Sequence, residues 1–395
     1  MTSIRKAATG DIRSRPGLFP NPEQQLVLRA ALGEKDEALA AYAQWAAGAD
    51  LTAEFDREVF RLLPLLYERL RVLEHRDALT GRLKGVYRLA WAKSHRLFAD
   101  TRPILERFVS AGLPVMALKG APLGLLYYGN VALRPMSDVD LVVPAARVDV
   151  AVGILQDLGY RPWKQVDTDL KRFRHAVGFY APGPREFDLH WHVLFDFCDD
   201  GPDQEFWQTA QPFRFLDQDI LTPDSTRMLV HTIIHGLRWN VEPPIRWIPD
   251  SIMILRQSAT NIDWEWVIDF GVRRRASFRL YLGLSHLAEH YAAPIPTHVL
   301  ERLGRTRLSL IERIECRSAL RPIHYESLFG PVWEALADFP VARESGSTLR
   351  VAGAFLHFLR FHWSLDGRRN IPGWLGRRIV RRASRGARAL MGRPD

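Results

Sequence analysis

The chain has 395 residues, of which 47% are hydrophobic and 25% are charged. This length suits two or three domains, and this composition excludes a wholly disordered protein. The formal net charge of +9 suggests an anionic partner such as a nucleic acid, a nucleotide or a membrane surface. The two cysteines, Cys198 and Cys316, are far apart and form no Cys/His pattern, which argues against a disulfide framework or a zinc module.

The sequence shows neither a signal peptide nor a membrane-spanning helix. The first residues lack a long apolar run, and no stretch of about 18 uncharged apolar residues occurs anywhere in the chain. Together with the cysteine pattern, these features predict a reduced, soluble, cytoplasmic protein.

The chain begins with a polar segment, residues 1–20, that we expect to be mobile. Asn21-Pro22-Glu23-Gln24 is typical of a helix start, with Asn21 as the cap and Gln24 reaching back to it. Apolar residues then recur at three- and four-residue steps as far as about residue 111, and Gly112 is well placed to end the last helix.

A mixed block follows, with strands predicted at 114–118, 138–143, 175–180 and 185–194 and helices at 121–128 and 148–158. Helical periodicity returns after Thr222-Pro223-Asp224 and holds to about residue 338. The predicted fold class is therefore α+β, a small mixed sheet between two helical regions. The expected divisions are 1–20, a helical region at 21–111, the α/β core at 112–220, a helical domain at 221–348 and an arginine-rich tail at 349–395.

Two aspartates one residue apart, Asp138 and Asp140, mark the candidate site. Side chains alternate along a strand, so both carboxylates are expected on one face, with Val139 and Leu141 directed into the core. Carboxylates this close repel each other unless a cation lies between them. Their oxygens suit Mg²⁺ or Mn²⁺, ions that bind together with phosphate groups.

Residues upstream of the pair suit an anion. Gly120 would let a phosphate approach the backbone at the start of the next helix, and Lys119 would add a point charge. Arg134 could hold a phosphate between its guanidinium nitrogens. Ser137 would bind a phosphate or a metal-bound water, or would only cap the turn.

A further carboxylate is predicted on a neighbouring strand, where Glu186, Asp188, His190 and His192 alternate and share one face. A third carboxylate would complete a two-metal site for in-line phosphoryl transfer. Hydrogen bonding of the histidines to the carboxylates is favoured over zinc binding, because no third zinc ligand is evident.

The strings Leu118-Lys-Gly120, Leu133-Arg-Pro-Met-Ser-Asp-Val-Asp-Leu-Val-Val143 and Phe187-Asp-Leu-His-Trp191 resemble a family pattern. It is that of the uncharacterised bacterial nucleotidyltransferases of the polymerase-beta-like superfamily. Similar segments outside the core extend the resemblance over about residues 20 to 300: Leu62–Tyr67, Leu221–Asp224, Ile245–Asp250 and Asp263-Trp264.

The resemblance implies that NMP is transferred from an NTP, with Mg²⁺ or Mn²⁺ held by Asp138, Asp140 and Asp188. Glutamate is commoner than aspartate at the third position, so Glu186 stays a rival of Asp188. Lys119-Gly120 stands where the superfamily usually has Gly-Ser. Lys119, Gly120, Arg134, Ser137 and His190 are the expected nucleotide-binding residues.

Two questions stay open at this level. The acceptor could be a small molecule, a peptide or tRNA, and the core could instead be a catalytically inactive nucleotide-binding or partner-binding module. The charge, however, has a clear location. Residues 349–395 contain eleven arginines and two aspartates, and no lysine or glutamate, so residues 1–348 are formally neutral. Any polyanion contact is therefore expected at the tail, where a merely solvated helix is the alternative.

Overall fold

The computed structural model describes residues 4, 19–49, 56–182, 185–195, 200–237, 245–308, 348–363 and 373. The chain divides into two compact units, Met1–Leu320 and Arg321–Asp395. Helix α17 (Thr348–His362) is the described element of the second unit. The other described elements belong to the first unit. In the described part of the chain no helix is long and apolar enough to span a bilayer.

The described residues of the N-terminal region form the helices α2 (Pro22–Leu32), α3 (Lys35–Ala46), α4 (Arg57–Val72) and α5 (Thr80–Ser110). The predicted start of α2 is confirmed, because Asn21 and Gln24 form a reciprocal capping box. The predicted end of α5 is also confirmed. Gly112 follows it with φ +65°, a conformation that glycine adopts without strain.

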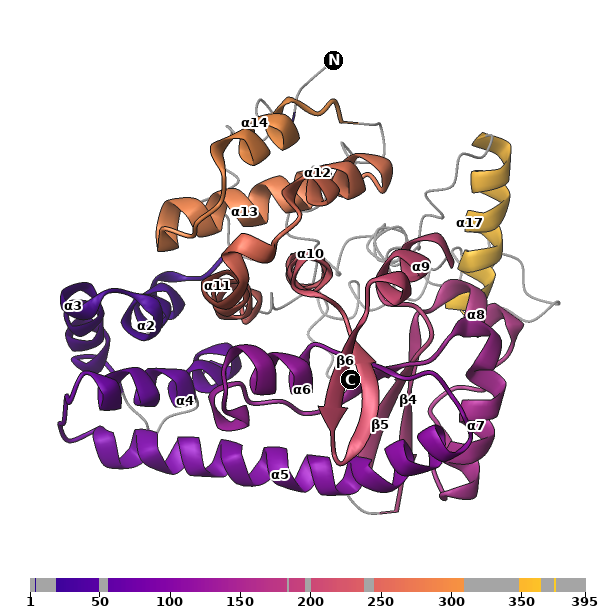
Figure 1. Ribbon diagram of the computed structural model, residues 1–395, viewed down its shortest axis with the longest axis horizontal. Coiled ribbons are helices and arrows are strands. Elements are labelled where there is room, and N and C mark those ends of the chain that lie inside the picture. Colours follow the sequence, from indigo (N-terminus) through magenta and orange to yellow (C-terminus); the bar gives the residue numbers. More distant parts are fainter. Residues whose placement is uncertain are drawn as a thin grey trace, which may run out of the picture. The chain divides into compact units, whose positions relative to one another are not determined.

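A seven-stranded mixed sheet forms the centre of the first unit (Figure 1). Its strands are β1 (Met116–Leu118), β2 (Asp140–Val142), β3 (Arg161–Pro162), β4 (Ala176–Ala181), β5 (Arg185–His190), β6 (Gln211–Phe215) and β7 (Gln218–Thr222). Their order across the sheet is β3-β4-β5-β2-β1-β7-β6. Strand β2 pairs parallel with β5 and antiparallel with β1. These three strands, all predicted from the sequence, therefore lie in the middle of the sheet.

Shorter helices connect these strands: α6 (Gly120–Pro122), the π-helical turn η1 (Leu123–Tyr127), η2 (Val131–Leu133), η3 (Ala145–Arg147), α7 (Val148–Asp157), α8 (Thr168–Phe173) and α9 (Asp200–Gln208). The long helix α5 passes along one side of the sheet (Figure 1). There Phe108 of α5 meets Phe187 of β5 with ring centroids 6.3 Å apart, and Phe98 meets Phe215 at 5.0 Å. The face that carries Phe187 is therefore a buried core, and the alternate residues of β5, including Asp188, face the opposite side.

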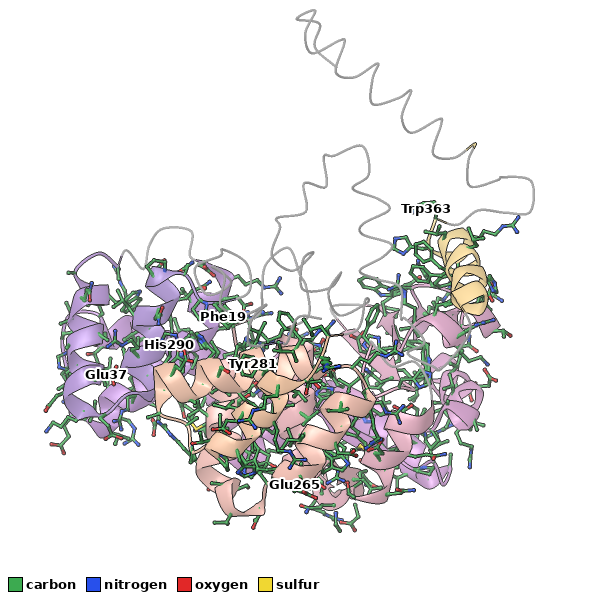
Figure 2. The ribbon with its side chains drawn as sticks, turned by 90° about the horizontal axis from the view of Figure 1, so that it is seen from above. Phe19, Glu37, Glu265, Tyr281, His290 and Trp363 are labelled. Atoms are coloured by element: carbon green, nitrogen blue, oxygen red, sulfur yellow. The ribbon has the colours of Figure 1, made fainter. Side chains whose placement is uncertain are left out.

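The C-terminal helices of the first unit are α10 (Ser225–Gly236), α11 (Trp247–Ser258), η4 (Ala259–Asn261), α12 (Trp264–Arg273), α13 (Ser277–Tyr291) and α14 (Thr297–Arg305). They share one hydrophobic core with α2, α4 and the Met116, Leu118 and Val142 side chains of the sheet. Phe19 stacks on His286 of α13 with centroids 4.5 Å apart, and Figure 2 shows Phe19 beside this helix. The end of the polar N-terminal segment is thus packed, while most of residues 1–18 lie outside the described residues.

The structure corrects several element boundaries. Strand β2 begins at Asp140, so Asp138 lies in the preceding loop and not on the strand. Strand β5 ends at His190, which places His192 beyond the sheet. Strands β3, β6 and β7 are additional, and β6 and β7 form an edge hairpin whose polar residues mask the alternating pattern. The predicted domain divisions stay predictions, because the described residues do not test them.

Candidate functional site

Strand register brings two of the predicted carboxylates together. Asp140 of β2 and Asp188 of β5 are direct partners in the parallel pair, so their side chains leave the same face of the sheet side by side. Asp138 lies two residues before Asp140. Its pKa responds to the charge of Asp140, and the pKa of Asp188 responds to both other carboxylates. The structure therefore brings together all three aspartates that the sequence analysis selected.

The three carboxylates differ in their electrostatic environment. Burial, and then the charge of Asp140, raises the pKa of Asp138 above its usual range. Burial also raises the pKa of Asp188, with the two other aspartates adding to the effect. Burial alone would raise the pKa of Asp140 too, but Lys119 and His190 hold it well below the usual value. Two carboxyl groups with raised pKa values thus flank one whose pKa is lowered.

Lys119 supplies the charge that stabilises Asp140. Its Nζ donates to Asp140 Oδ1 at 3.0 Å, and both side chains are largely buried. The Lys119 backbone has φ 45° and ψ −104°, a conformation that residues with a side chain rarely adopt. The tight turn between β1 and α6 therefore directs the ammonium group at the carboxylate.

Gly120 lies close to the loop that carries Asp138. A Cβ atom at position 120 would lie 3.3 Å from Met136 Sδ, 3.5 Å from the Asp138 carbonyl oxygen and 3.7 Å from Arg134 Nη1. The helix that follows is short, Gly120–Pro122, and continues as a π-helical turn. A side chain at position 120 would need a small shift of Met136, and the expected role of Gly120 in phosphate binding stays a prediction.

His190 lies beside the same carboxylate. It is 3% exposed, and its Nε2 is 3.0 Å from Asp140 Oδ1, although the contact lacks hydrogen-bond geometry. Among the described residues, neither ring nitrogen of His190 makes a hydrogen bond. His190 thus lies beside the carboxylates as expected but without the predicted hydrogen bond, and its role in nucleotide binding stays a prediction. Ser137, in contrast, is exposed and lies 3.4 Å from Asp138 Oδ1 through its hydroxyl.

Arg134 makes a buried ion pair that the sequence analysis missed. Its Nε and Nη2 donate to the two carboxylate oxygens of Asp250, each at 2.8 Å, and Tyr128 donates its hydroxyl to the same group at 2.8 Å. Two of the guanidinium nitrogens are therefore already occupied, and the third, Nη1, lies next to Gly120. Binding of phosphate by Arg134 stays a prediction.

Helix α11 holds the loop before Asp138 at a second point. Arg246, at the start of α11, donates from Nη1 to the carbonyl of Pro135 at 2.7 Å, while its Nε is buried without a hydrogen bond. Burial near Arg134 and Arg61 lowers the pKa of Arg246 to about 10. Arg246 therefore binds the loop at Pro135, while Asp250, one helical turn further on, binds it at Arg134. The segment Ile245–Asp250 stood out in the sequence, but nothing there indicated which residues of the loop it would contact.

Two further histidines, His192 and His231, make contacts within the protein. His192 Nδ1 lies 2.5 Å from Asp203 Oδ2, and His231 Nε2 lies 2.9 Å from the Val193 carbonyl oxygen. Burial lowers the pKa of His231 to about 3, so this ring is neutral. Within the described ranges, no group of three or more His, Cys, Asp or Glu side chains has the geometry of a metal site.

The chemistry of the carboxylates nevertheless suits a hard divalent cation. In the part of the chain that the structure describes, neither Asp138 nor Asp188 forms an ion pair, and both pKa values are raised. A divalent cation would remove the repulsion that raises them. The Glu186 side chain, the two cysteines and the arginines at 364–395 lie outside the described residues.

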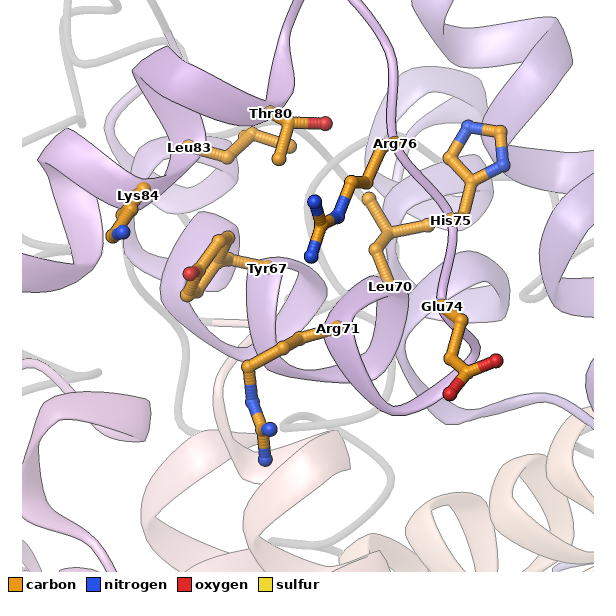
Figure 3. A pocket seen from close by; sticks show the side chains of 9 residues that line it. All are labelled: Tyr67, Leu70, Arg71, Glu74, His75, Arg76, Thr80, Leu83 and Lys84. Atoms are coloured by element: carbon orange, nitrogen blue, oxygen red, sulfur yellow. The ribbon is translucent and has the colours of Figure 1, made fainter.

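A separate cavity of about 640 Å³ lies where α4 leads into α5 (Figure 3). Its lining combines aromatic, apolar and charged side chains: Tyr67, Leu70, Arg71, Glu74, His75, Arg76, Thr80, Leu83 and Lys84. None of the predicted site residues contributes to it.

Comparison with known proteins places this geometry in context. A family model described as "Uncharacterised nucleotidyltransferase" matches residues 58–293. A search of curated proteins found no match. A solved structure described as the antibiotic-resistance factor ANT(2'')-Ia is similar at 18% identity and a TM-score of 0.32, over 50% of this chain and 99% of that one. Because the family model covers more than half of the chain and includes all three aspartates, the chain belongs to this family of uncharacterised nucleotidyltransferases.

Proposed function

We propose that the chain transfers a nucleotidyl group from an NTP to an acceptor, with Mg²⁺ or Mn²⁺ bound by Asp138, Asp140 and Asp188. The observation that carries this proposal is the register of Asp140 with Asp188, together with the raised pKa values of Asp138 and Asp188. When bound, the metal would neutralise the triphosphate and stabilise the charge that develops during transfer.

The residues of the chain would carry out the remaining steps. Lys119, which pairs with Asp140, would turn its ammonium group to the triphosphate when the nucleotide binds. Asp188 would accept the proton of the acceptor hydroxyl as a general base. The acceptor oxygen then forms a bond to the α-phosphorus, the bond from that phosphorus to the pyrophosphate oxygen breaks, and pyrophosphate leaves.

A second candidate function has one observation in its favour. The Lys119–Asp140 pair gives Asp140 a counter-ion without any metal, as expected for an inactive nucleotide-binding or partner-binding module. Binding of Mg·NTP without release of pyrophosphate against any acceptor would support this alternative.

The test uses Asp138→Asn. Asp138 forms no ion pair in the described part of the chain, so this change should leave the fold intact, whereas changing Asp140 would also strand Lys119. Wild-type protein is incubated with Mg²⁺, each [α-³²P]NTP and three acceptor pools: tRNA, peptides and small molecules. We expect labelled product and pyrophosphate from the wild type and at least a hundredfold loss in the variant.

The matched control is Asp219→Asn, which removes an exposed aspartate of β7 that pairs with Arg214. It should retain wild-type transfer. Full activity of Asp138→Asn would refute the assignment of the metal site.

A further inference from the structure

An exposed tryptophan lies next to the third carboxylate. Trp163 follows β3 and is 65% exposed. Its backbone N–H donates to the carbonyl of Gly178 at 2.9 Å, which continues the β3–β4 pairing beyond the strand. Gly178 is in turn the register partner of Asp188. Trp163, Gly178 and Asp188 therefore lie in one row across three strands, on the face that carries the candidate site.

Gly178 keeps the space between the ring and the carboxylate open. A Cβ atom at this position would lie 3.1 Å from Asp188 Oδ1 and 3.8 Å from Cδ2 and Cε2 of the Trp163 indole. The carboxylate and the ring thus flank the same point of the sheet. Any larger side chain at position 178 would fill the space between the Trp163 ring and the Asp188 carboxylate.

Trp163 is much more exposed than the core tryptophans. Other tryptophans of this unit, such as Trp45, Trp191 and Trp247, are at most 3% exposed and belong to the core. Tyr180, two residues from Gly178 on the same face of β4, is also 47% exposed. Two exposed aromatic side chains beside a cluster of carboxylates form an apolar surface at the edge of a reactive centre.

The order of the strands places this surface on the side away from the triphosphate-binding residues. Lys119 and Gly120 follow β1, on one side of β2, whereas Trp163 and Gly178 lie across β5 on the other side. In-line transfer needs the attacking oxygen and the leaving pyrophosphate on opposite sides of the α-phosphorus. Asp188 is the carboxylate nearest to the Trp163 side, which suits the binding of an acceptor there.

We propose that Trp163 binds the acceptor, and that the acceptor is a small molecule whose ring carries the reacting hydroxyl. One face of a sugar or aromatic ring packs on the indole, and the ring hydroxyl reaches Asp188, which takes its proton as the new bond to the α-phosphorus forms. This inference rests on the proposed nucleotidyl transfer. A small acceptor fits better than tRNA, because the site gathers carboxylates and residues 1–348 carry no net charge, whereas RNA needs a basic track.

The test compares Trp163→Ala and Trp163→Phe with wild type. Each protein receives Mg²⁺ and [α-³²P]NTP together with the dialysable fraction of a bacterial extract or, separately, with total tRNA. We expect label in a dialysable product. Loss of ring stacking in Trp163→Ala should raise the KM for the acceptor fraction about tenfold. Trp163→Phe should raise it less, and the KM for NTP should change less than the KM for the acceptor in both variants.

The control variant is Trp91→Ala, which removes another exposed tryptophan, 49% exposed and stacked on His95 of α5. It should keep wild-type kinetics. Equal acceptor KM values for wild type and Trp163→Ala would overturn the inference while leaving the proposed transfer intact. Labelling of tRNA alone would overturn the small-molecule class. Absence of both label and pyrophosphate from the wild type would overturn the proposed function and this inference with it.

Discussion

Arg134 and Asp250 are 116 residues apart in the sequence, and they form a bidentate ion pair in the interior of the first unit. The pair joins the loop that carries Asp138 to helix α11. Removing one partner leaves the other charge buried without compensation, which is strongly destabilising. The pair therefore fixes the position of the loop as well as contributing to stability.

The first prediction follows from this pair. Arg134→Met should lower the free energy of unfolding by about 3 to 5 kcal/mol, because Asp250 would remain buried and charged. Urea unfolding measures the change, and Arg134→Met with Asp250→Leu should recover part of the loss. Arg29→Met, which breaks the exposed pair with Glu37, should cost less than about 1 kcal/mol. A loss at Arg134 no larger than that at Arg29 would show that the buried pair does not hold the loop.

The second prediction separates the two properties of Lys119. Lys119→Met removes the partner of Asp140 and should destabilise the fold by about 3 kcal/mol. Lys119→Gly removes the same partner but relieves the strained backbone at φ 45°, which is worth roughly 1 kcal/mol. The expected order of melting temperatures is wild type, then glycine, then methionine. If the methionine variant were the more stable of the two, the backbone at this position would not be strained.

The third prediction concerns the pH dependence of Asp188. Its pKa is raised in the folded chain, so the fold holds this proton more tightly than the unfolded chain does. Stability is therefore lost as pH rises through the window between the unfolded and folded pKa values. Without metal, Asp188→Asn should melt above wild type at neutral pH, and the difference should shrink as pH falls below the ordinary pKa of an aspartate.

The rate of catalysis should also depend on the ionisation of Asp188. Because Asp188 must be ionised to accept a proton, the rate of transfer should rise with pH as its carboxyl group loses its proton. Scanning calorimetry and a pH–rate profile measure the two effects. A higher melting temperature for Asp188→Asn at acidic pH as well would show that packing, and not charge, explains the change.

The fourth prediction concerns the arginine-rich tail. A chain without residues 349–395 loses the whole formal net charge of +9 and should bind heparin more weakly, with a smaller dependence on salt. Binding of Mg·NTP should be spared, because the three aspartates belong to the first unit. Heparin chromatography and nucleotide titration distinguish the two effects. Equal retention on heparin would refute a polyanion contact at the tail.

The sequence was sufficient to locate the central strands and the aspartate pair. Asp138 and Asp140 stand next to an apolar run, so local pattern alone reveals them, whereas the choice of Asp188 over Glu186 on the same strand face came from the family resemblance. The α+β class was confirmed for the same reason. Short edge strands such as β3 were missed, because two residues carry no periodic signal.

Contacts between distant segments could not be read from the sequence. Nothing near Arg134 indicates that its carboxylate partner is Asp250, and nothing near Trp163 indicates that the chain returns at Gly178 to place it beside Asp188. Such neighbours arise from strand order and helix packing. The exposure of Trp163 could not be predicted from the sequence either, because a tryptophan is most simply interpreted as a core residue.

The Lys119–Asp140 pair has a consequence for the order in which ligands arrive. While the ammonium group neutralises Asp140, a free divalent cation has to compete with a charge that the protein carries itself. A metal–nucleotide complex does not face this competition, since its phosphates offer the ammonium group a new partner. We therefore expect metal and nucleotide to bind together. Mg²⁺ alone should leave the melting temperature unchanged, and the protein without nucleotide should hold no metal ion at its carboxylates.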